Sequence, residues 1–118
     1  MRKLPPPVAL GADDEAVLQQ VVDYYHRRLK QTPDALTYLK SRGLDSAEAV
    51  AHFKLGFADR TLGLRLPHAN RQLGAELRGR LQQLGIIRES GHEHFNGSLV
   101  VPILDAAGKV RGLYGRKV

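Results

Sequence analysis

The order of the sequence patterns predicts an α+β fold, with about four helices followed by a small antiparallel sheet. Apolar residues recur at spacings of three and four along much of residues 13–84, which is typical of amphipathic helices. Two β-branched runs joined by turn residues follow in residues 98–114, which is typical of a hairpin. A chain of 118 residues with 42% hydrophobic composition forms one domain or subdomain.

Residues 1–12, MRKLPPPVALGA, are interpreted as a linker, because their three consecutive prolines favour an extended polyproline segment. We expect this linker to tether a preceding domain. The folded part, residues 13–118, is expected to open with a helix that Asp13 caps. The apolar stripe of this helix holds Val17, Val21, Tyr24 or Tyr25, and Leu29. Its last turns carry basic residues that complement the helix dipole or face an anion: His26, Arg27, Arg28 and Lys30.

A second, short helix is expected to start at Thr32, with Pro33 in its first position. Leu36 and Leu39 should face inward, and Gly43 should end the helix because glycine tolerates positive φ.

The third helix is expected to start from a capping-box variant at residues 45–48 and to hold Val50 and Phe53. Residues 55–58 are interpreted as a short strand or bend. Asn70 is expected to cap a fourth helix that Gly85 ends. The apolar face of this fourth helix consists of Leu73, Leu77, Leu81 and Leu84.

The predicted hairpin joins residues 98–104 to residues 109–114 through the turn sequence Asp-Ala-Ala-Gly. The first strand is apolar on both faces, as Leu99 and Val100 illustrate, so both faces should be covered. Pro102 lacks an amide for the ladder and is expected at an edge or bulge.

The composition limits the classes of function. Eighteen Lys and Arg against 12 Asp and Glu give a net charge of +6, which favours a polyanionic partner such as nucleic acid or simply confers solubility. The absence of cysteine excludes disulfides, a cysteine nucleophile and thiolate metal sites. No apolar run is long enough for a membrane helix, and we expect a cytoplasmic protein with no membrane partner.

Self-sufficient catalytic chemistry is not predicted for this chain. His92 and His94 are two residues apart and could share a metal on a strand, but ordinary loop histidines are the favoured interpretation. A two-metal site needs converging carboxylates, and the late part of the chain offers only Glu89, Glu93 and Asp105. We therefore assign no catalytic and no metal-binding residues.

The C-terminal end is basic and spaced by glycines. Lys109 and Arg111 alternate along the second strand, so both are expected on one face. Arg116 and Lys117 follow, and such side chains make phosphate contacts. Tyr114, between two glycines, either stacks a base or is a core residue that faces inward with Val110.

Two segments together resemble the N-terminal part of the catalytic core of DnaG-type bacterial primases. They are YYHRRLKQTPDALTYLKSRGLDSAEAVAHFKLGFA at residues 24–58 and GHEHFNGSLVVPILDAAGKVRGLYGRKV at residues 91–118. The segments HFNGSLVVP and YGRK are most similar to primase-type proteins of plasmids and integrative elements.

The resemblance implies a subdomain that lies between a zinc-binding domain and a Toprim domain. Both domains are expected to be absent from this chain, and Zn²⁺ and Mg²⁺ would be bound there. It implies that Arg42 and Arg116 line a basic nucleic-acid groove and that Lys109 and Arg111 contribute from the hairpin. His94, Asn96 and Ser98 stand where cellular primases have arginines, so we expect hydrogen bonds to nucleic acid there.

The leading interpretation is a part of a primase that holds a single-stranded DNA template and the incoming nucleotide, with a replicative helicase as a partner of the full-length protein. One alternative is a single-stranded DNA-binding module of a mobile-element protein without primer synthesis. A second alternative is a protein-interaction domain with an acidic partner. The isolated chain is expected to be inactive.

Overall fold

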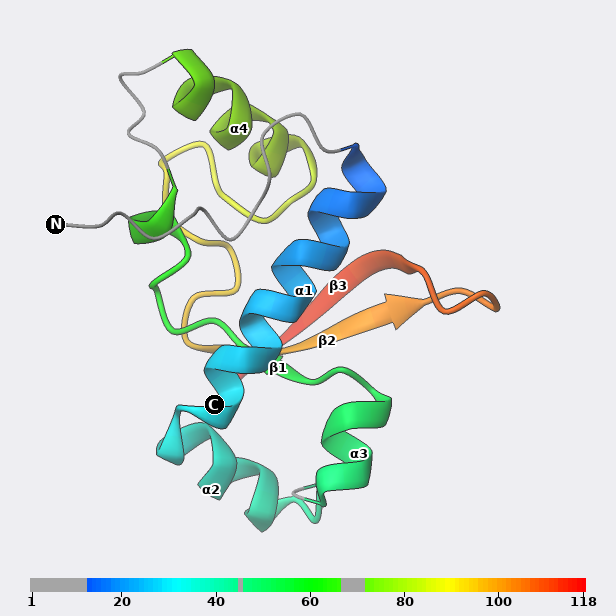
Figure 1. Cartoon of the computed structure of the whole chain (residues 1–118). Helices are drawn as coiled ribbons and strands as arrows, with labels where there is room; N and C mark the ends of the chain where they lie inside the picture. Colours follow the sequence, from blue (N-terminus) through cyan, green and yellow to red (C-terminus); the bar gives the residue numbers. More distant parts are fainter. Residues whose placement is uncertain (1–12, 45, 67–71) are drawn as a thin grey trace, which may run out of the picture.

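The computed structural model describes residues 13–44, 46–66 and 72–118. Its elements follow in the order α1 (Asp14–Lys30), α2 (Pro33–Ser41), α3 (Ala47–His52), β1 (Gly56–Phe57), the 3-10 helix η1 (Gly63–Arg65), α4 (Gln72–Gln83), β2 (Ser98–Leu104) and β3 (Val110–Lys117) (Figure 1). The predicted α+β class and the hairpin are confirmed. The expected linker at residues 1–12 and the expected cap Asn70 lie outside the described residues.

Helix α1 is the central element of the fold. The side chain of Asp13 accepts a 2.8 Å hydrogen bond from the amide of Ala16, which confirms the predicted cap. Helix α1 packs against β1 and β3, and Gly56 makes this approach possible. A Cβ at Gly56 would lie 2.7 Å from the Cβ of Tyr25, too close for any other residue without movement of the backbone. The predicted stripe is buried: Val17, Val21, Tyr24, Tyr25 and Leu29.

Helices α2 and α3 are short, and their ends follow local sequence signals. Thr32 occupies the cap position of α2, but its hydroxyl donates to the Arg28 carbonyl at 2.7 Å. Gly43 has φ 71°, as predicted for a residue that ends a helix. Ser46 caps α3 by accepting a 3.1 Å hydrogen bond from the Ala49 amide.

The prediction that α3 holds Phe53 was wrong. Helix α3 ends at His52, and Phe53 is 52% exposed with its ring edge-on to the His52 ring. Phe53 is the C-cap residue of α3 and lies outside the apolar core, so no buried cluster covers its ring. In α2, Leu39 is buried and Leu36 is only half-buried.

The sheet has the antiparallel order β1-β2-β3. Strand β1 pairs only with Leu99 and Val100, so β2 has an open edge beyond that point. Pro102 lies there, which confirms its predicted edge position. We predicted that both faces of β2 are covered. This is confirmed only for the first half of the strand, since Ile103 and Leu104 near the hairpin tip are exposed.

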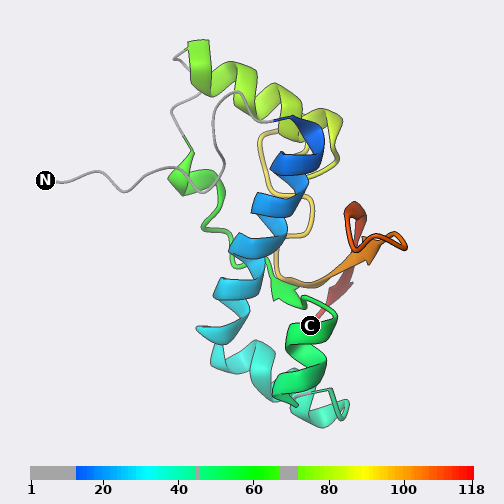
Figure 2. The same cartoon turned by 45° about the vertical axis from the view of Figure 1, so that its right-hand side comes forward.

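Two apolar clusters flank the sheet. The first joins α1, α4 and Val100, and Leu77 and Leu81 are the buried residues of α4 within it. The second joins α2, α3, Leu29 and Leu99. Figures 1 and 2 show α4 at one end of α1 and the pair α2 and α3 at the other end. Because α1 contributes to both clusters, it fixes the position of the sheet relative to all helices.

Candidate nucleic-acid interface

Three segments that are distant in sequence meet at the start of β2. The Ala58 amide donates to the Ser98 carbonyl at 3.1 Å, and the Gly97 amide donates to the Ala58 carbonyl at 2.8 Å. On the other side, Ser98 pairs with Lys117 of β3. The loop before β2 is therefore held between the segment that follows β1 and the end of β3.

A cleft of about 520 Å³ opens at this junction, which is within the usual size range of ligand sites. Tyr114 and Leu113 point to opposite faces of β3 and both line the cleft, so it follows the open edge of this strand. The cleft has cationic, aromatic and apolar walls, and none of its described lining residues is acidic: Leu84, Gly85, Arg88, His94, Phe95, Ser98, Leu113, Tyr114, Gly115 and Lys117.

Phe95 is the packed aromatic residue of this cleft. It is half-buried, contacts the first apolar cluster and meets the His94 ring edge-on at a centroid distance of 4.9 Å. Any side chain at position 115 would overlap the Phe95 ring, so glycine is required at Gly115. The glycine that follows Tyr114 thus allows close packing within the protein itself.

Only some of the residues that the sequence predicts to bind nucleic acid line the cleft. His94, Tyr114 and Lys117 line the cleft. Arg116 shares a strand face with Tyr114 and makes no ion pair with any described residue. Tyr114 is 57% exposed, so its interpretation as a core residue that faces inward with Val110 was wrong. Its cross-strand partner is Val101, which is itself half-buried.

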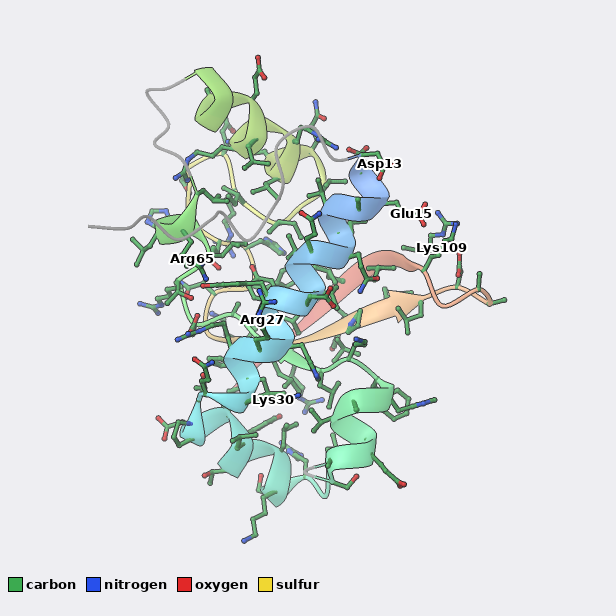
Figure 3. All side chains as sticks on the ribbon, viewed as in Figure 1. Asp13, Glu15, Arg27, Lys30, Arg65 and Lys109 are labelled. Atoms are coloured by element: carbon green, nitrogen blue, oxygen red, sulfur yellow. The ribbon has the colours of Figure 1, made fainter. Side chains whose placement is uncertain are left out.

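Lys109 and Arg111 differ from the simple alternation that we expected. Lys109 precedes β3, and its Nζ lies 3.2 Å from Glu15 Oε1 at the first turn of α1 (Figure 3). Arg111 Nε lies 2.8 Å from Asp105 Oδ2 in the hairpin turn. A register shift beside Leu104 also interrupts the alternation. Both cations are therefore partly neutralised by the fold.

Asp105 organises the hairpin turn, as its predicted role required. Its Oδ1 accepts hydrogen bonds from the amides of Lys109 and Ala107 at 3.0 and 2.9 Å. The Lys109 amide, with help from Arg111, holds the pKa of the Asp105 carboxyl below its usual range. This carboxylate is committed to the turn.

Arg42 does not line the cleft. Its guanidinium stacks over the Tyr38 ring at 5.4 Å from the centroid, at the end of α2. Stacking leaves the in-plane donors of the guanidinium available for an anion.

Sequence reasoning missed Arg88, Phe95 and Arg60. Arg60 has φ 71°, which is uncommon for a residue with a side chain, and its Nε donates to Asn96 Oδ1 at 2.5 Å. Arg60 and Asn96 are 36 residues apart, so no local sequence pattern predicts their contact.

Glu93 was also missed as a structural residue. It is buried, and its Oε1 accepts a 3.2 Å hydrogen bond from the Tyr25 hydroxyl. Its other oxygen lies 3.5 Å from the Gly63 amide. Burial raises the pKa of the Glu93 carboxyl above its usual range, against the lowering effect of these two hydrogen bonds. Glu93 thereby links the loop before β2 to α1 and η1.

The two histidines lie in the loop before β2. His92 Nδ1 is within 3.0 Å of the Ser90 hydroxyl, and His94 contacts the Phe95 ring. In the described part of the chain, no three acidic or histidine side chains come together in a way that could hold a metal ion. None of the helices in the described ranges is long and apolar enough to cross a membrane.

Comparisons with known proteins agree with the resemblance found in the sequence. Residues 24–118 match the family model of the DNA primase catalytic core, N-terminal domain. A DNA primase of Pasteurella multocida is 29% identical over 104 residues, which cover 85% of this chain and 17% of that protein. The chain thus spans about a sixth of the length of this relative.

Solved structures show the same fold. A structure of the DnaG catalytic core matches with a TM-score of 0.74 and 27% identity, over 90% of this chain and 34% of the other. A DnaG primase catalytic domain bound to single-stranded DNA matches with a TM-score of 0.66 and 27% identity, over 88% and 34% of the two chains. The family model covers most of the sequence, and this chain therefore belongs to the family of DNA primase catalytic core N-terminal domains.

Proposed function

We propose that this domain holds a single-stranded DNA template for a primase, with the strand lying along the cleft at the open edge of β3. The observation that carries the proposal is the combination of Arg88 and Lys117 with Phe95 and Tyr114 in a cleft without described acidic lining residues. Cations follow a phosphate backbone, and aromatic rings stack bases regardless of sequence. The related catalytic domain that was solved with single-stranded DNA supports the same partner.

The domain would contribute binding of template and incoming nucleotide, whereas metal-assisted chemistry belongs to other parts of a longer protein. Phosphoryl transfer of this kind uses divalent metal held by converging carboxylates. The described residues do not fit such a metal, since no suitable group of three ligands is present among them. The assignment of Mg²⁺ and Zn²⁺ to neighbouring domains rests on the sequence resemblance to primases.

Family membership favours the primase interpretation over a module without primer synthesis and over a protein-interaction domain. A replicative helicase as partner of the full-length protein, a mobile-element origin and a cytoplasmic location are part of the proposal. The HFNGSLVVP segment supports the mobile-element origin, as a sequence resemblance only.

The proposal is tested by fluorescence anisotropy of a labelled single-stranded oligonucleotide over a series of salt concentrations. Three or four phosphate contacts predict a slope of log affinity against log salt of about −2 to −3, at roughly −0.7 for each contact. A peptide nucleic acid of the same sequence, with an uncharged backbone, is the control and should bind much more weakly. Absence of DNA binding at low salt, or equal binding of the two oligomers, would refute the proposal.

A further inference from the structure

Asn96 lies between two cations that come from opposite sides of β2. Its side-chain Oδ1 accepts a 2.5 Å hydrogen bond from Arg60 Nε. Its backbone carbonyl accepts a 3.0 Å hydrogen bond from Lys117 Nζ. One neutral residue therefore bonds a guanidinium through its side chain and an ammonium through its backbone.

The sheet itself sets up this arrangement. Ala58 pairs with the start of β2 through the hydrogen bonds to Ser98 and Gly97, which carries the loop at Arg60 to one side of Asn96. Lys117 is opposite Ser98 in the β2–β3 register, which places it on the other side. Both positions follow from backbone pairing, so the site is built into the fold.

Both cations keep most of their hydrogen-bonding capacity. A guanidinium has five N–H donors and an ammonium three, and Asn96 uses one of each. Neither Arg60 nor Lys117 forms an ion pair within the described ranges. Five other cations of the chain do form ion pairs there: Arg28, Lys54, Arg80, Lys109 and Arg111. Charges that the fold leaves unneutralised are the ones that release counterions when phosphate binds.

The backbone conformation of Arg60 also supports a functional role for this residue. A residue with a side chain is strained at φ 71°, and glycine would adopt this conformation without cost. The neighbouring Asp59 fixes the loop by bonding Arg28 Nε at 2.6 Å and the Thr61 hydroxyl at 2.5 Å. An arginine therefore occupies a position that favours glycine, and its guanidinium contacts Asn96.

We propose that Arg60 and Lys117 form a phosphate-binding site for the backbone of single-stranded DNA, with Asn96 as the positioning residue that holds the two cations. Lys117 also lines the cleft, so the bound phosphate would belong to a strand lying in it. This inference rests on the proposed function and adds to it a defined phosphate contact that uses a residue outside the predicted set.

The most informative variant is Arg60→Gly, because it removes the guanidinium and relieves the strained φ. The melting temperature should stay the same or rise, while affinity for a single-stranded oligonucleotide should fall about three- to fivefold, as for loss of an exposed ion pair. The salt slope should flatten by about 0.7. Lys117→Ala should lower the affinity by a similar factor.

Asn96→Ala should weaken binding in the wild-type background but add little to Arg60→Gly, because a positioning residue acts through its partner. Asn96→Asp would place a carboxylate against Arg60 and should also weaken binding, which gives a second test if Asn96→Ala folds poorly. Arg80→Gln is the matched control for loss of one charge. Arg80 pairs with Asp14 at the start of α1, whereas Asp59, the neighbour of Arg60, pairs with Arg28 near the end of α1. Asp14 and Arg28 are about 20 Å apart along the helix at a rise of 1.5 Å per residue, so Arg80 lies far from the proposed site.

The outcomes are distinguishable. If the wild-type chain does not bind DNA, the proposed function and this inference both fail. If it binds, and Arg60→Gly behaves like Arg80→Gln, only this inference fails, because Arg60 does not line the cleft that carries the proposed function. A labelled nucleoside triphosphate separates the two sources of phosphate: its affinity should be unchanged by Arg60→Gly. Loss of nucleotide binding without loss of DNA binding would overturn the assignment to the template backbone.

Discussion

Replacing Gly56 with alanine should strongly destabilise the domain. The new Cβ would lie 2.7 Å from Tyr25 Cβ and 2.8 Å from the Tyr25 carbonyl carbon, and the second of these atoms belongs to the helix backbone. Ordinary carbon contacts need about 0.8 Å more, so α1 and β1 must separate. Overpacking costs about 1–3 kcal/mol, and we expect about 3 kcal/mol because no flexible side chain can give way. In a domain of this size, that lowers the melting temperature by about 15 °C.

Thermal unfolding followed by circular dichroism measures this effect, and Gly79→Ala is the matched control. Gly79 lies within α4, and a Cβ there meets no atom within 4 Å. The same substitution should therefore raise stability by about 0.5–1 kcal/mol, the usual gain for alanine over glycine in a helix. A Gly56→Ala protein that melts within about 3 °C of wild type would refute the close packing of α1 on β1.

Three further predictions concern charge and activity. Arg116→Ala should flatten the salt slope of DNA binding by about 0.7, whereas Arg111→Ala should change it less because Asp105 already pairs with Arg111. Incubated with single-stranded template, nucleotides and magnesium or manganese, the isolated chain should give no primers on a sequencing gel, and robust synthesis would contradict our expectation that the isolated chain is inactive. Because burial raises the folded-state pKa of Glu93, the folded state binds its proton more tightly. Denaturant unfolding of wild type relative to Glu93→Gln should therefore show stability falling as the pH rises from about 4.5 toward neutral, and a rise would contradict the assignment.

The sequence predicts well the features that short-range chemistry determines. The cap at Asp13, the positive φ of Gly43 and the hairpin turn at Asp105 all follow from a residue type at a fixed place in an element. The edge position of Pro102 also follows: Pro102 pairs with β3 on one side, and its missing amide is tolerated because β1 does not extend along the other side.

Contacts between distant segments account for the remaining features. Glu93 and Tyr25 are 68 residues apart, so nothing local distinguishes Glu93 from an exposed loop residue. Lys109 looked free beside the turn, but α1 brings Glu15 to it. Arg60 reaches the cleft region only through the β1–β2 pairing. Phe53 was misjudged for a related reason, since helix spacing cannot tell whether another element covers the residue.

The central claim, that single-stranded DNA lies along the open edge of β3, is tested most directly by NMR. Backbone amide shifts of the labelled domain would be followed while a short single-stranded oligonucleotide is added. We expect the largest changes at residues 84–97 and 113–117, together with Arg60, and small changes at the first turn of α1. Changes centred on the hairpin turn and the start of α1, with the cleft residues unaffected, would contradict the claim.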